Sequence, residues 1–389
     1  MISNRIDKVV TTAIRDIPYY KKYKELYASI ADFEALPIIN KEIVNRYYNQ
    51  FVRNSSERVL YSWTSGTTGT PLKIIWNQRE YIESYKYLWQ LRKKWYNILP
   101  LHKVCMFHSS ALDGDKIVTK QVVTTDKKIS FGRCTFNDKD FEYYKFMLEK
   151  FEPDWILAPP SILCAITEYF NKYKFKPKQL KYIELNGELV SNSAYKFLRN
   201  YYNVPVANLY GSMEFNGIAL TCPFGHMHLI KQNIVLECLE VNGYSNIILT
   251  GLINHHMPLI RYNIGDCGEM LPTQCRCGRE NELILHNGRV SELIKFKEKK
   301  IDPIFFNSLI DQINFDSRII TQYQVIVKDN TIHLLLLVDE DHFSMVQHLT
   351  YSLQKKIFKI MNTHIEVKVT KDPNDIYNST KKFSNIVYL

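Results

Sequence analysis

The chain has 389 residues, of which 46% are hydrophobic and 23% are charged. This is the composition of a globular protein, and it excludes a disordered, collagen-like or coiled-coil chain. The 50 lysines and arginines exceed the 40 aspartates and glutamates and give a formal net charge of +10, which favours an anionic ligand. Because the basic residues are scattered along the chain, the sequence does not predict nucleic-acid binding.

Neither a membrane span nor a signal peptide is expected. The longest aliphatic run, residues 334–338, is far shorter than the about 20 apolar residues that a membrane helix needs. Residues 1–8 lack the apolar core and the small-residue cleavage site of a signal peptide. We therefore expect a soluble cytoplasmic protein.

Hydrophobic spacing predicts helices and parallel strands in the first half of the chain. Residues 6–17 carry an apolar stripe at helical spacing. Farther along, short β-rich runs alternate with helical runs. The predicted strands are residues 104–108, 155–158 and 182–185, and the predicted helices are residues 141–151 and 160–173. Strands and helices that alternate at this spacing are typical of a parallel α/β sheet.

The last 100 or so residues have a different pattern. The predicted elements are a strand at 293–296, a helix at 303–313, a hairpin of strands 323–328 and 331–338, a helix at 342–361 and a strand at 365–369. The order β-α-β-β-α-β is that of a small ferredoxin-like α+β unit of about 100 residues.

The distribution of glycine indicates where a site and a domain boundary lie. All 14 glycines fall between Gly66 and Gly288. Since glycine permits tight turns and close approach of the backbone to a ligand, the site is expected in this middle stretch. We predict a large N-terminal α/β domain with parallel sheets over residues 1–288 and the small C-terminal domain over residues 289–389.

The strongest local signal is residues 62–73, Ser-Trp-Thr-Ser-Gly-Thr-Thr-Gly-Thr-Pro-Leu-Lys. Backbone N–H groups in such a loop can surround an anion, the hydroxyls can donate to its oxygens, and Lys73 adds positive charge. The usual nucleotide-triphosphate P-loop differs, because its lysine directly follows the last glycine. The pattern favours a phosphate-binding loop over a plain Ser/Thr-rich surface turn.

Residues 64–73 resemble the phosphate-binding signature of the acyl-adenylate-forming superfamily, in particular the phenylacetate–CoA ligase branch and its capsule-biosynthesis relatives. Other segments resemble further motifs of that family in the right order. They are Asn-Gly-Glu-Leu at 186–189, Tyr-Gly-Ser-Met-Glu at 210–214, Pro-Leu-Ile-Arg-Tyr-Asn-Ile-Gly-Asp at 258–266, and Gly-Arg at 288–289. Five ordered motifs are much more specific than any one of them, and the chain is identified as a member on this resemblance.

The resemblance implies an ATP-dependent, AMP-forming ligase. A carboxylate would attack the α-phosphorus of ATP and pyrophosphate would leave, so catalysis would consist mainly of positioning and charge neutralisation. Glu214 would bind the Mg²⁺ that bridges phosphate oxygens; the alternative is a solvated glutamate after a turn. Tyr210 would flank the adenine, Asp266 would accept hydrogen bonds from the ribose hydroxyls, and Arg289 would reach the ribose or a phosphate.

The resemblance also assigns the rest of the nucleotide site. The residues expected to surround the β- and γ-phosphates are Ser65, Gly66, Thr67, Thr68, Gly69 and Lys73. The other residues expected to line the nucleotide are Gly187, Glu188, Gly211 and Ser212.

Two features near the C-terminus depart from the family pattern. The family has a catalytic lysine in a Gly-Lys-Phe-like loop; here Lys382 precedes Phe383, and Lys381 replaces the glycine. We assign the role to Lys382, with Lys381 as the alternative and a solvated basic tail as the plain interpretation. Residues 288–292, Gly-Arg-Val-Ser-Glu, lack the aspartate of the family hinge, which puts acyl transfer by a mobile C-terminal domain in doubt but not adenylation.

Three cysteines and one of two histidines predict a structural zinc site. Cys275 and Cys277 form a C-x-C pair before a glycine, and Cys222 is followed by His226 and His228. Two thiolates at a turn, completed by a distant cysteine and histidine, suit tetrahedral Zn²⁺. The resemblance implies that some members of this branch carry such a metal, with a Gly-x-x-His segment that favours His228 over His226. The alternative is four ordinary reduced side chains.

The remaining predictions concern the acyl pocket, the partners and cofactors, and an alternative function. Candidate substrate residues are His108, Ala158, Pro159 and Asn186. The expected partners are a carboxylic acid and an acceptor, which is CoA, an acyl-carrier protein or an amine; a homodimer is permitted. The expected cofactors are ATP/AMP, Mg²⁺, Zn²⁺ and CoA. The alternative to an enzyme is a nucleotide- or acyl-binding relative that has lost turnover and acts as a binding module.

Overall fold

The computed structural model describes residues 2–64, 71–108, 122–132, 138–241, 244–289, 294–296, 299–301, 304–314, 319–328, 331–372, 374–377 and 386–388. The chain divides into two compact units. Unit 1 is Met1–Pro100 with Ala207–Ser291, and unit 2 is Leu101–Val206 with Glu292–Leu389. The domain boundary predicted after residue 288 stays a prediction.

Helices of unit 1 form where apolar side chains recur on one face and polar residues cap the ends. The predicted helix over residues 6–17 is present as α1 (Ile2–Asp16), which buries Val9 and Val10. The Asn40 side chain caps the N-terminus of α3 (Lys41–Arg46) by accepting from the Ile43 N–H. The helices of this unit are α1, α2 (Pro18–Lys21), η1 (Ile30–Ala35), α3 (Lys41–Arg46), α4 (Tyr48–Phe51) and α5 (Gln78–Tyr96).

The strands of unit 1 are almost all antiparallel, and the sequence analysis did not predict them. A five-stranded sheet contains β1 (Ile39–Asn40), β12 (Ile234–Val241), β13 (Tyr244–Gly251), β14 (Tyr262–Pro272) and β15 (Asn281–Arg289). Within it only β1 and β14 pair in parallel. A hairpin consists of β2 (Val59–Trp63) and β3 (Lys73–Asn77), and a further antiparallel ladder of β9 (Val206–Ser212), β10 (Asn216–Thr221) and β11 (Met227–Leu229).

The first part of unit 2 confirms the predicted parallel α/β arrangement. Its strands lie in the order β8-β7-β4-β6-β5, and all neighbouring pairs are parallel except β5 with β6. The elements are β4 (Val104–Phe107), β5 (Val122–Thr124), β6 (Lys128–Phe131), α6 (Asp138–Phe151), β7 (Trp155–Ala158), α7 (Pro160–Lys172), β8 (Tyr182–Asn186) and α8 (Asn192–Tyr202). Strand β7 is buried along its whole length, as expected for a strand that is covered on both faces.

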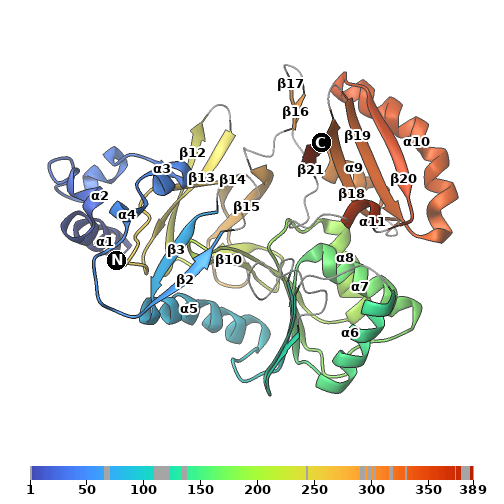
Figure 1. Cartoon of the computed structure of the whole chain (residues 1–389), viewed down its shortest axis with the longest axis horizontal. Helices are drawn as coiled ribbons and strands as arrows, with labels where there is room; N and C mark the ends of the chain where they lie inside the picture. Colours follow the sequence, from blue (N-terminus) through green and yellow to red (C-terminus); the bar gives the residue numbers. More distant parts are fainter. Residues whose placement is uncertain are drawn as a thin grey trace. The chain divides into compact units, whose positions relative to one another are not determined.

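The C-terminal part of unit 2 has a four-stranded sheet in the order β20-β19-β18-β21, covered by α10 (Figure 1). The predicted first strand is present but pairs elsewhere: β16 forms a two-stranded hairpin with β17, and β21 takes an edge of the sheet beside β18. A local hairpin closes at a lower entropic cost than a long-range pairing. The elements are β16 (Ile294–Phe296), β17 (Lys299–Ile301), α9 (Ile304–Ile313), β18 (Ile320–Lys328), β19 (Thr331–Val338), α10 (Glu340–Met361), β20 (Ile365–Thr370), α11 (Asn374–Tyr377) and β21 (Ile386–Tyr388).

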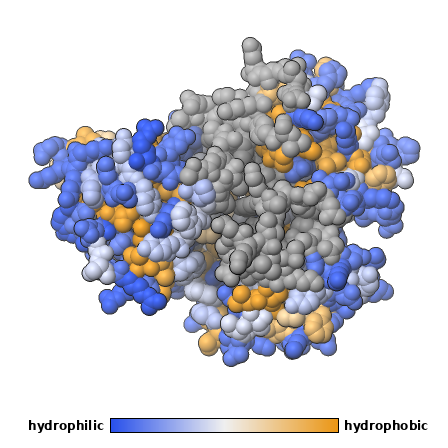
Figure 2. Space-filling view, viewed as in Figure 1, coloured by the Kyte–Doolittle hydropathy of each residue, from blue (hydrophilic) through white to orange (hydrophobic). Residues whose placement is uncertain are grey.

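The coloured part of the face in Figure 2 is largely polar. Figure 2 shows hydrophilic side chains over most of the coloured face, interrupted by small hydrophobic patches. Across the described ranges, the structure contains no helix with the length and apolar character that crossing a membrane requires.

Candidate functional site

Unit 1 brings three of the predicted nucleotide-binding residues into one polar cluster. Tyr210 lies near the end of β9, Glu214 follows that strand, and Asp266 lies on β14. The Tyr210 hydroxyl donates to Oδ2 of Asp266 at 2.6 Å, and the Tyr262 hydroxyl donates to Oε1 of Glu214 at 3.1 Å. Two segments about 50 residues apart in sequence are therefore joined by two hydroxyl–carboxylate hydrogen bonds. We call Tyr210, Glu214, Tyr262 and Asp266 the carboxylate cluster.

The turn that carries Glu214 is held by hydrogen bonds to α5. The side-chain amide of Asn216 donates to the Ser84 hydroxyl at 2.7 Å, and its oxygen accepts from the Tyr85 hydroxyl at 3.3 Å. Asn216 has a φ of 58°, which asparagine tolerates better than most residues. Gly211 is required for a different reason: a Cβ there would lie 2.6 Å from the Asn216 carbonyl oxygen. The backbone around Ser212 and Glu214 is thus fixed from two sides.

A buried arginine anchors the segment that leads into Asp266. Arg261 has a φ of 52°, and its guanidinium donates to Glu237 at 2.8 Å, to the Leu36 carbonyl at 2.7 Å and to the Glu34 carbonyl. A left-handed conformation is unfavourable for arginine, so these hydrogen bonds must offset it. They attach the start of β14 to β12 and to the N-terminal segment, which sets the position of Tyr262.

In unit 2, the predicted substrate residues follow neighbouring parallel strands. His108 comes after β4, Pro159 after β7, and Asn186 ends β8. Ala158 is the last residue of β7 and pairs in register with β8. Because the carboxyl ends of parallel strands meet at one edge of a sheet, these residues share that edge. The pKa of His108 is lowered by burial and by Lys128, which favours a neutral imidazole.

Glu188 connects the predicted adenine stretch to the predicted substrate wall. Its Oε1 accepts from the Ser161 hydroxyl at 2.9 Å and its Oε2 from the Ser161 backbone N–H at 3.1 Å. A carboxylate at the N-terminus of α7 also interacts favourably with the helix dipole. Gly187 has a φ of +79°, a conformation that favours glycine. The turn at 187–188 is thereby fixed against α7.

Several predicted residues can be only partly placed. The phosphate-loop residues Ser65, Gly66, Thr67, Thr68 and Gly69 lie outside the described residues, as does Lys382. Lys73 begins β3, and its ammonium group lies over the ring of Tyr61, 3.9 Å from the ring centroid. The backbone of Arg289 pairs in register with Asp266, and its side chain lies outside the described parts.

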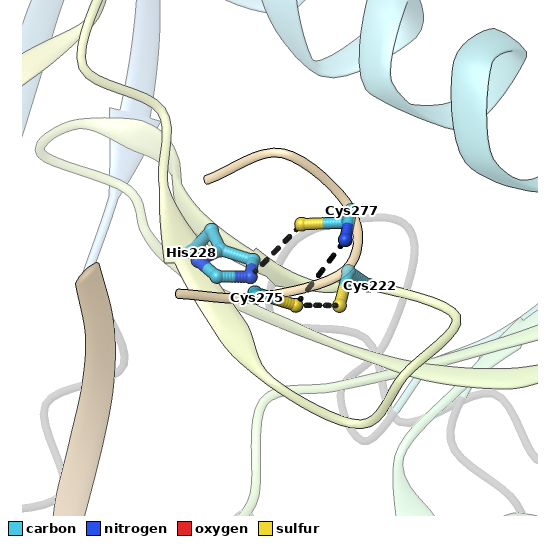
Figure 3. A group of neighbouring side chains, drawn as sticks. All are labelled: Cys222, His228, Cys275 and Cys277. Carbon is cyan, nitrogen blue, oxygen red and sulfur yellow. Dashed lines mark hydrogen bonds between the residues drawn. The ribbon is translucent and has the colours of Figure 1, made fainter. Parts of the chain in front are cut away.

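Four predicted metal ligands lie together (Figure 3). They are Cys222, His228, Cys275 and Cys277, and their ligand atoms all lie within 4.8 Å of one another. The Sγ atoms of Cys222 and Cys275 are 3.6 Å apart, and Nε2 of His228 is 3.2 Å from Sγ of Cys277. We call these four residues the cysteine cluster. Three thiols and one imidazole make four ligands, which is the donor set that a structural zinc site uses.

The orientation of the histidine ring fits metal binding. Nδ1 of His228 is 2.6 Å from the Asn281 carbonyl oxygen, which can only accept, so Nδ1 carries the proton and Nε2 presents its lone pair to the thiols. The pKa of His228 is lowered by burial, which also favours the neutral ring. Nδ1 of His226 is instead 2.7 Å from Glu282, and that ring lies outside the cluster.

Sequence reasoning missed three residues that support the site. Tyr262, Arg261 and Asn216 hold Glu214 and Asp266 in place. Tyr262 and Arg261 lie inside the quoted segment 258–266, so their proximity to Asp266 was a signal. Asn216 had none, because its partners are set by tertiary packing.

Comparisons with known proteins place the fold among ligases. No family model matches the chain. Among curated proteins, Protein CapK of Staphylococcus aureus is 22% identical over 92% of this chain and 84% of its own length. A structure of 2-hydroxyisobutyryl-CoA ligase in the postadenylation state matches with a TM-score of 0.78 and 14% identity, over 100% of this chain and 89% of that chain. A benzoate CoA ligase from Burkholderia xenovorans LB400 matches with a TM-score of 0.55 and 10% identity, over 85% of this chain and 68% of that chain.

Proposed function

The chain has the α/β fold of the acyl- and aryl-CoA ligases, as the sequence motifs predicted, and we propose from this premise that it is an ATP-dependent, AMP-forming ligase. It would activate a carboxylic acid as an acyl-adenylate and pass the acyl group to a thiol, of CoA or a carrier protein, or to an amine. The observation that carries the proposal is the carboxylate cluster, because it joins the motif residues assigned to adenine, magnesium and ribose.

The chemistry of the cluster suits a magnesium nucleotide. Glu214 is 8% exposed, and within the cluster it accepts from the neutral Tyr262 hydroxyl, which orients the carboxylate without neutralising it. Carboxylate oxygens are the ligands that Mg²⁺ prefers. Glu214 would hold the ion, which would supply positive charge to the phosphates, while Asp266 would accept from the ribose hydroxyls. Tyr210 keeps the Asp266 carboxylate oriented for that role.

The phosphate loop and the C-terminal lysine complete the proposal. Residues 65–69 with Lys73 would surround the β- and γ-phosphates, Arg289 would reach the ribose or a phosphate, and Lys382 would neutralise the transferring phosphate. At the edge of unit 2, His108, Ala158, Pro159 and Asn186 would face the acid. We propose a role in polysaccharide or natural-product biosynthesis; the similarity to Protein CapK, which extends over most of both chains, supports the capsule branch.

The test is acid-dependent exchange of labelled pyrophosphate into ATP, with a broad panel of carboxylic acids and saturating Mg²⁺. We expect exchange with at least one acid and none without acid. Absence of exchange with every acid, together with detectable ATP binding by calorimetry, would favour the binding module instead. Adding CoA, a carrier protein or an amine to the responding acid then identifies the acceptor.

We also propose that the cysteine cluster holds a structural Zn²⁺. Three thiolates around Zn²⁺ leave a net charge of about −1 on the site. Arg279 is suited to offset it: the residue follows the C-x-C turn, donates to the Leu229 carbonyl at 2.8 Å, and lies over the ring of Trp95. The metal would pin the turn after β10 to the loop between β14 and β15. Elemental analysis of the purified protein should give about one zinc per chain.

A further inference from the structure

A small cavity inside unit 1 lies against Glu214. Its walls include Trp76 from β3, Asn233 just before β12, and the apolar side chains of Phe215, Met257 and Leu259. It has room for about one water molecule. Trp76 and Asn233 are each only 2% exposed, so any polar atom that faces the cavity has lost contact with bulk water.

Two polar atoms of these walls lack a hydrogen-bond partner among the described residues, namely Nε1 of Trp76 and Oδ1 of Asn233. The orientation of the Asn233 amide is fixed, because its nitrogen donates to the Ser84 carbonyl at 2.7 Å and to the Gly217 carbonyl at 3.2 Å. Exchanging the amide oxygen and nitrogen would therefore lose two good hydrogen bonds. Buried donors and acceptors are rarely left unpaired, and a bound water is the usual remedy.

The chemistry of the walls selects water over an ion. A cation would meet the positive end of the indole N–H bond, and an anion would meet the Asn233 oxygen and the Glu214 carboxylate. Water can accept from Trp76 and donate to both oxygens, which gives the three hydrogen bonds typical of a buried water. The other polar side chain of the wall, Asn254, already donates to the Ile75 carbonyl and accepts from the backbone N–H groups of His256 and Met257.

We propose that one water molecule bound in this cavity links Trp76 and Asn233 to the carboxylate of Glu214. Tyr262 holds Oε1 of the same carboxylate at 3.1 Å, so the water gives the group a second point of attachment. Trp76 and Asn233 are then positioning residues that reduce the freedom of the magnesium ligand. The magnesium part of this inference rests on the proposed function; the water itself does not.

The first test is a crystal structure of the unaltered protein at a resolution that shows ordered water. We expect a density peak in the cavity with the three named partners at about 2.7–3.2 Å. A cavity without density would overturn the proposal. So would a peak whose oxygen ligands lie at about 2.0–2.6 Å, because those distances belong to a bound Mg²⁺ or Ca²⁺ ion.

The second test is the magnesium dependence of pyrophosphate exchange in Trp76→Phe, which removes the indole N–H. We expect the Mg²⁺ concentration at half-maximal rate to rise about 3–10-fold, the effect of one lost hydrogen bond, with the rate at saturating Mg²⁺ within about twofold. Trp155→Phe is the matched control, since Trp155 is buried to a similar extent, at 3% exposure, and lies in unit 2. It should leave the magnesium dependence unchanged.

The outcomes separate this inference from the proposed function. Unchanged magnesium dependence in an active Trp76→Phe enzyme would overturn the positioning role. If the unaltered protein shows no exchange, the proposed function fails while the crystallographic test of the water still stands. If Trp76→Phe does not fold, Glu214→Gln, which keeps the shape of the side chain and an oxygen acceptor, provides a second crystal structure in which the water peak must persist.

Discussion

The carboxylate cluster and the cysteine cluster both belong to unit 1, but their side chains are held in opposite ways. In the cysteine cluster, the four ligand atoms all lie within 4.8 Å of one another. In the carboxylate cluster, Glu214 and Asp266 each accept from a tyrosine hydroxyl that is neutral and leaves the negative charge in place. Four ligand atoms gathered around one point suit a resident metal, whereas a carboxylate such as Glu214, oriented by a neutral hydroxyl, suits a ligand that binds and leaves.

A third carboxylate in the same unit, that of Glu237, differs from Glu214 because it is paired with an arginine. Glu237 accepts from the Arg261 guanidinium through both oxygens, at 2.8 to 3.2 Å, so its charge is already neutralised. Such a pair maintains structure and offers little to a ligand. If this comparison is right, changes in the carboxylate cluster should reduce chemistry with little loss of stability, and changes in the cysteine cluster should do the reverse.

The largest effect is expected from Glu214→Gln, which keeps the shape and removes the charge. Pyrophosphate exchange should fall about 10²–10³-fold, the usual range for losing one electrostatic contact to the reacting phosphates. The melting temperature should change by no more than a few degrees. Glu237→Gln is the matched control: it should lower the melting temperature and leave the exchange rate per folded molecule nearly unchanged. Wild-type exchange in Glu214→Gln would remove this residue from the proposed site.

A smaller loss is expected from Lys382→Ala, because one positive charge near the transferring phosphate is removed. We expect exchange to fall about 100-fold, with unfolding by denaturant unchanged. Lys381→Ala serves as the neighbouring control and should retain exchange within about threefold. If the two variants give the opposite ranking, the catalytic role passes to Lys381; if both retain full exchange, the C-terminal lysines take no part in adenylation.

How far the sequence could predict the fold depended on whether the signal was local. The parallel strands at 104–107 and 155–158 carry continuous apolar runs, and the C-x-C turn already holds two ligands side by side, so these could be recognised. The antiparallel sheet of β12 to β15 could not, because register shifts between Asn246 and Ile248 and between Asp266 and Cys267 disrupt its alternation.

The same distinction applies to the candidate site. Glu214 and Asp266 were identifiable as motif residues, but their tyrosine partners depend on β9 and β14 folding in one unit, which no short segment reveals. Glu188 illustrates this further: the motif predicted contact with the nucleotide, and the structure adds two hydrogen bonds to Ser161 that only the packing of β8 against α7 could create. Tertiary partners, more than residue identities, were the part that the sequence did not contain.

The cysteine cluster should show the reverse pattern of Glu214→Gln. Cys275→Ser should abolish bound zinc and lower the free energy of unfolding by about 3–5 kcal/mol, since loss of a metal site is among the most destabilising point changes. Exchange per folded molecule should stay within about threefold. Cys238→Ser, a half-buried cysteine on β12 outside the cluster, is the control and should retain zinc. Zinc retained in Cys275→Ser, or zinc absent from the unaltered protein, would contradict the assignment.

The smallest effect is expected from Tyr210→Phe, which removes the hydroxyl that donates to Asp266 at 2.6 Å and keeps the ring that we propose flanks the adenine. Asp266 would then be oriented less well for the ribose, and the KM for ATP should rise about 3–10-fold, as for one hydrogen bond to a charged group. The maximal rate should change little, because no charge near the reacting phosphorus is altered.

Tyr201→Phe, which removes a hydroxyl that donates to the Phe175 carbonyl in unit 2, is the control and should leave the KM for ATP unchanged. A fall in maximal rate at constant KM would instead place the Tyr210 hydroxyl near the reacting atoms and break the distinction between an orienting hydroxyl and a catalytic one.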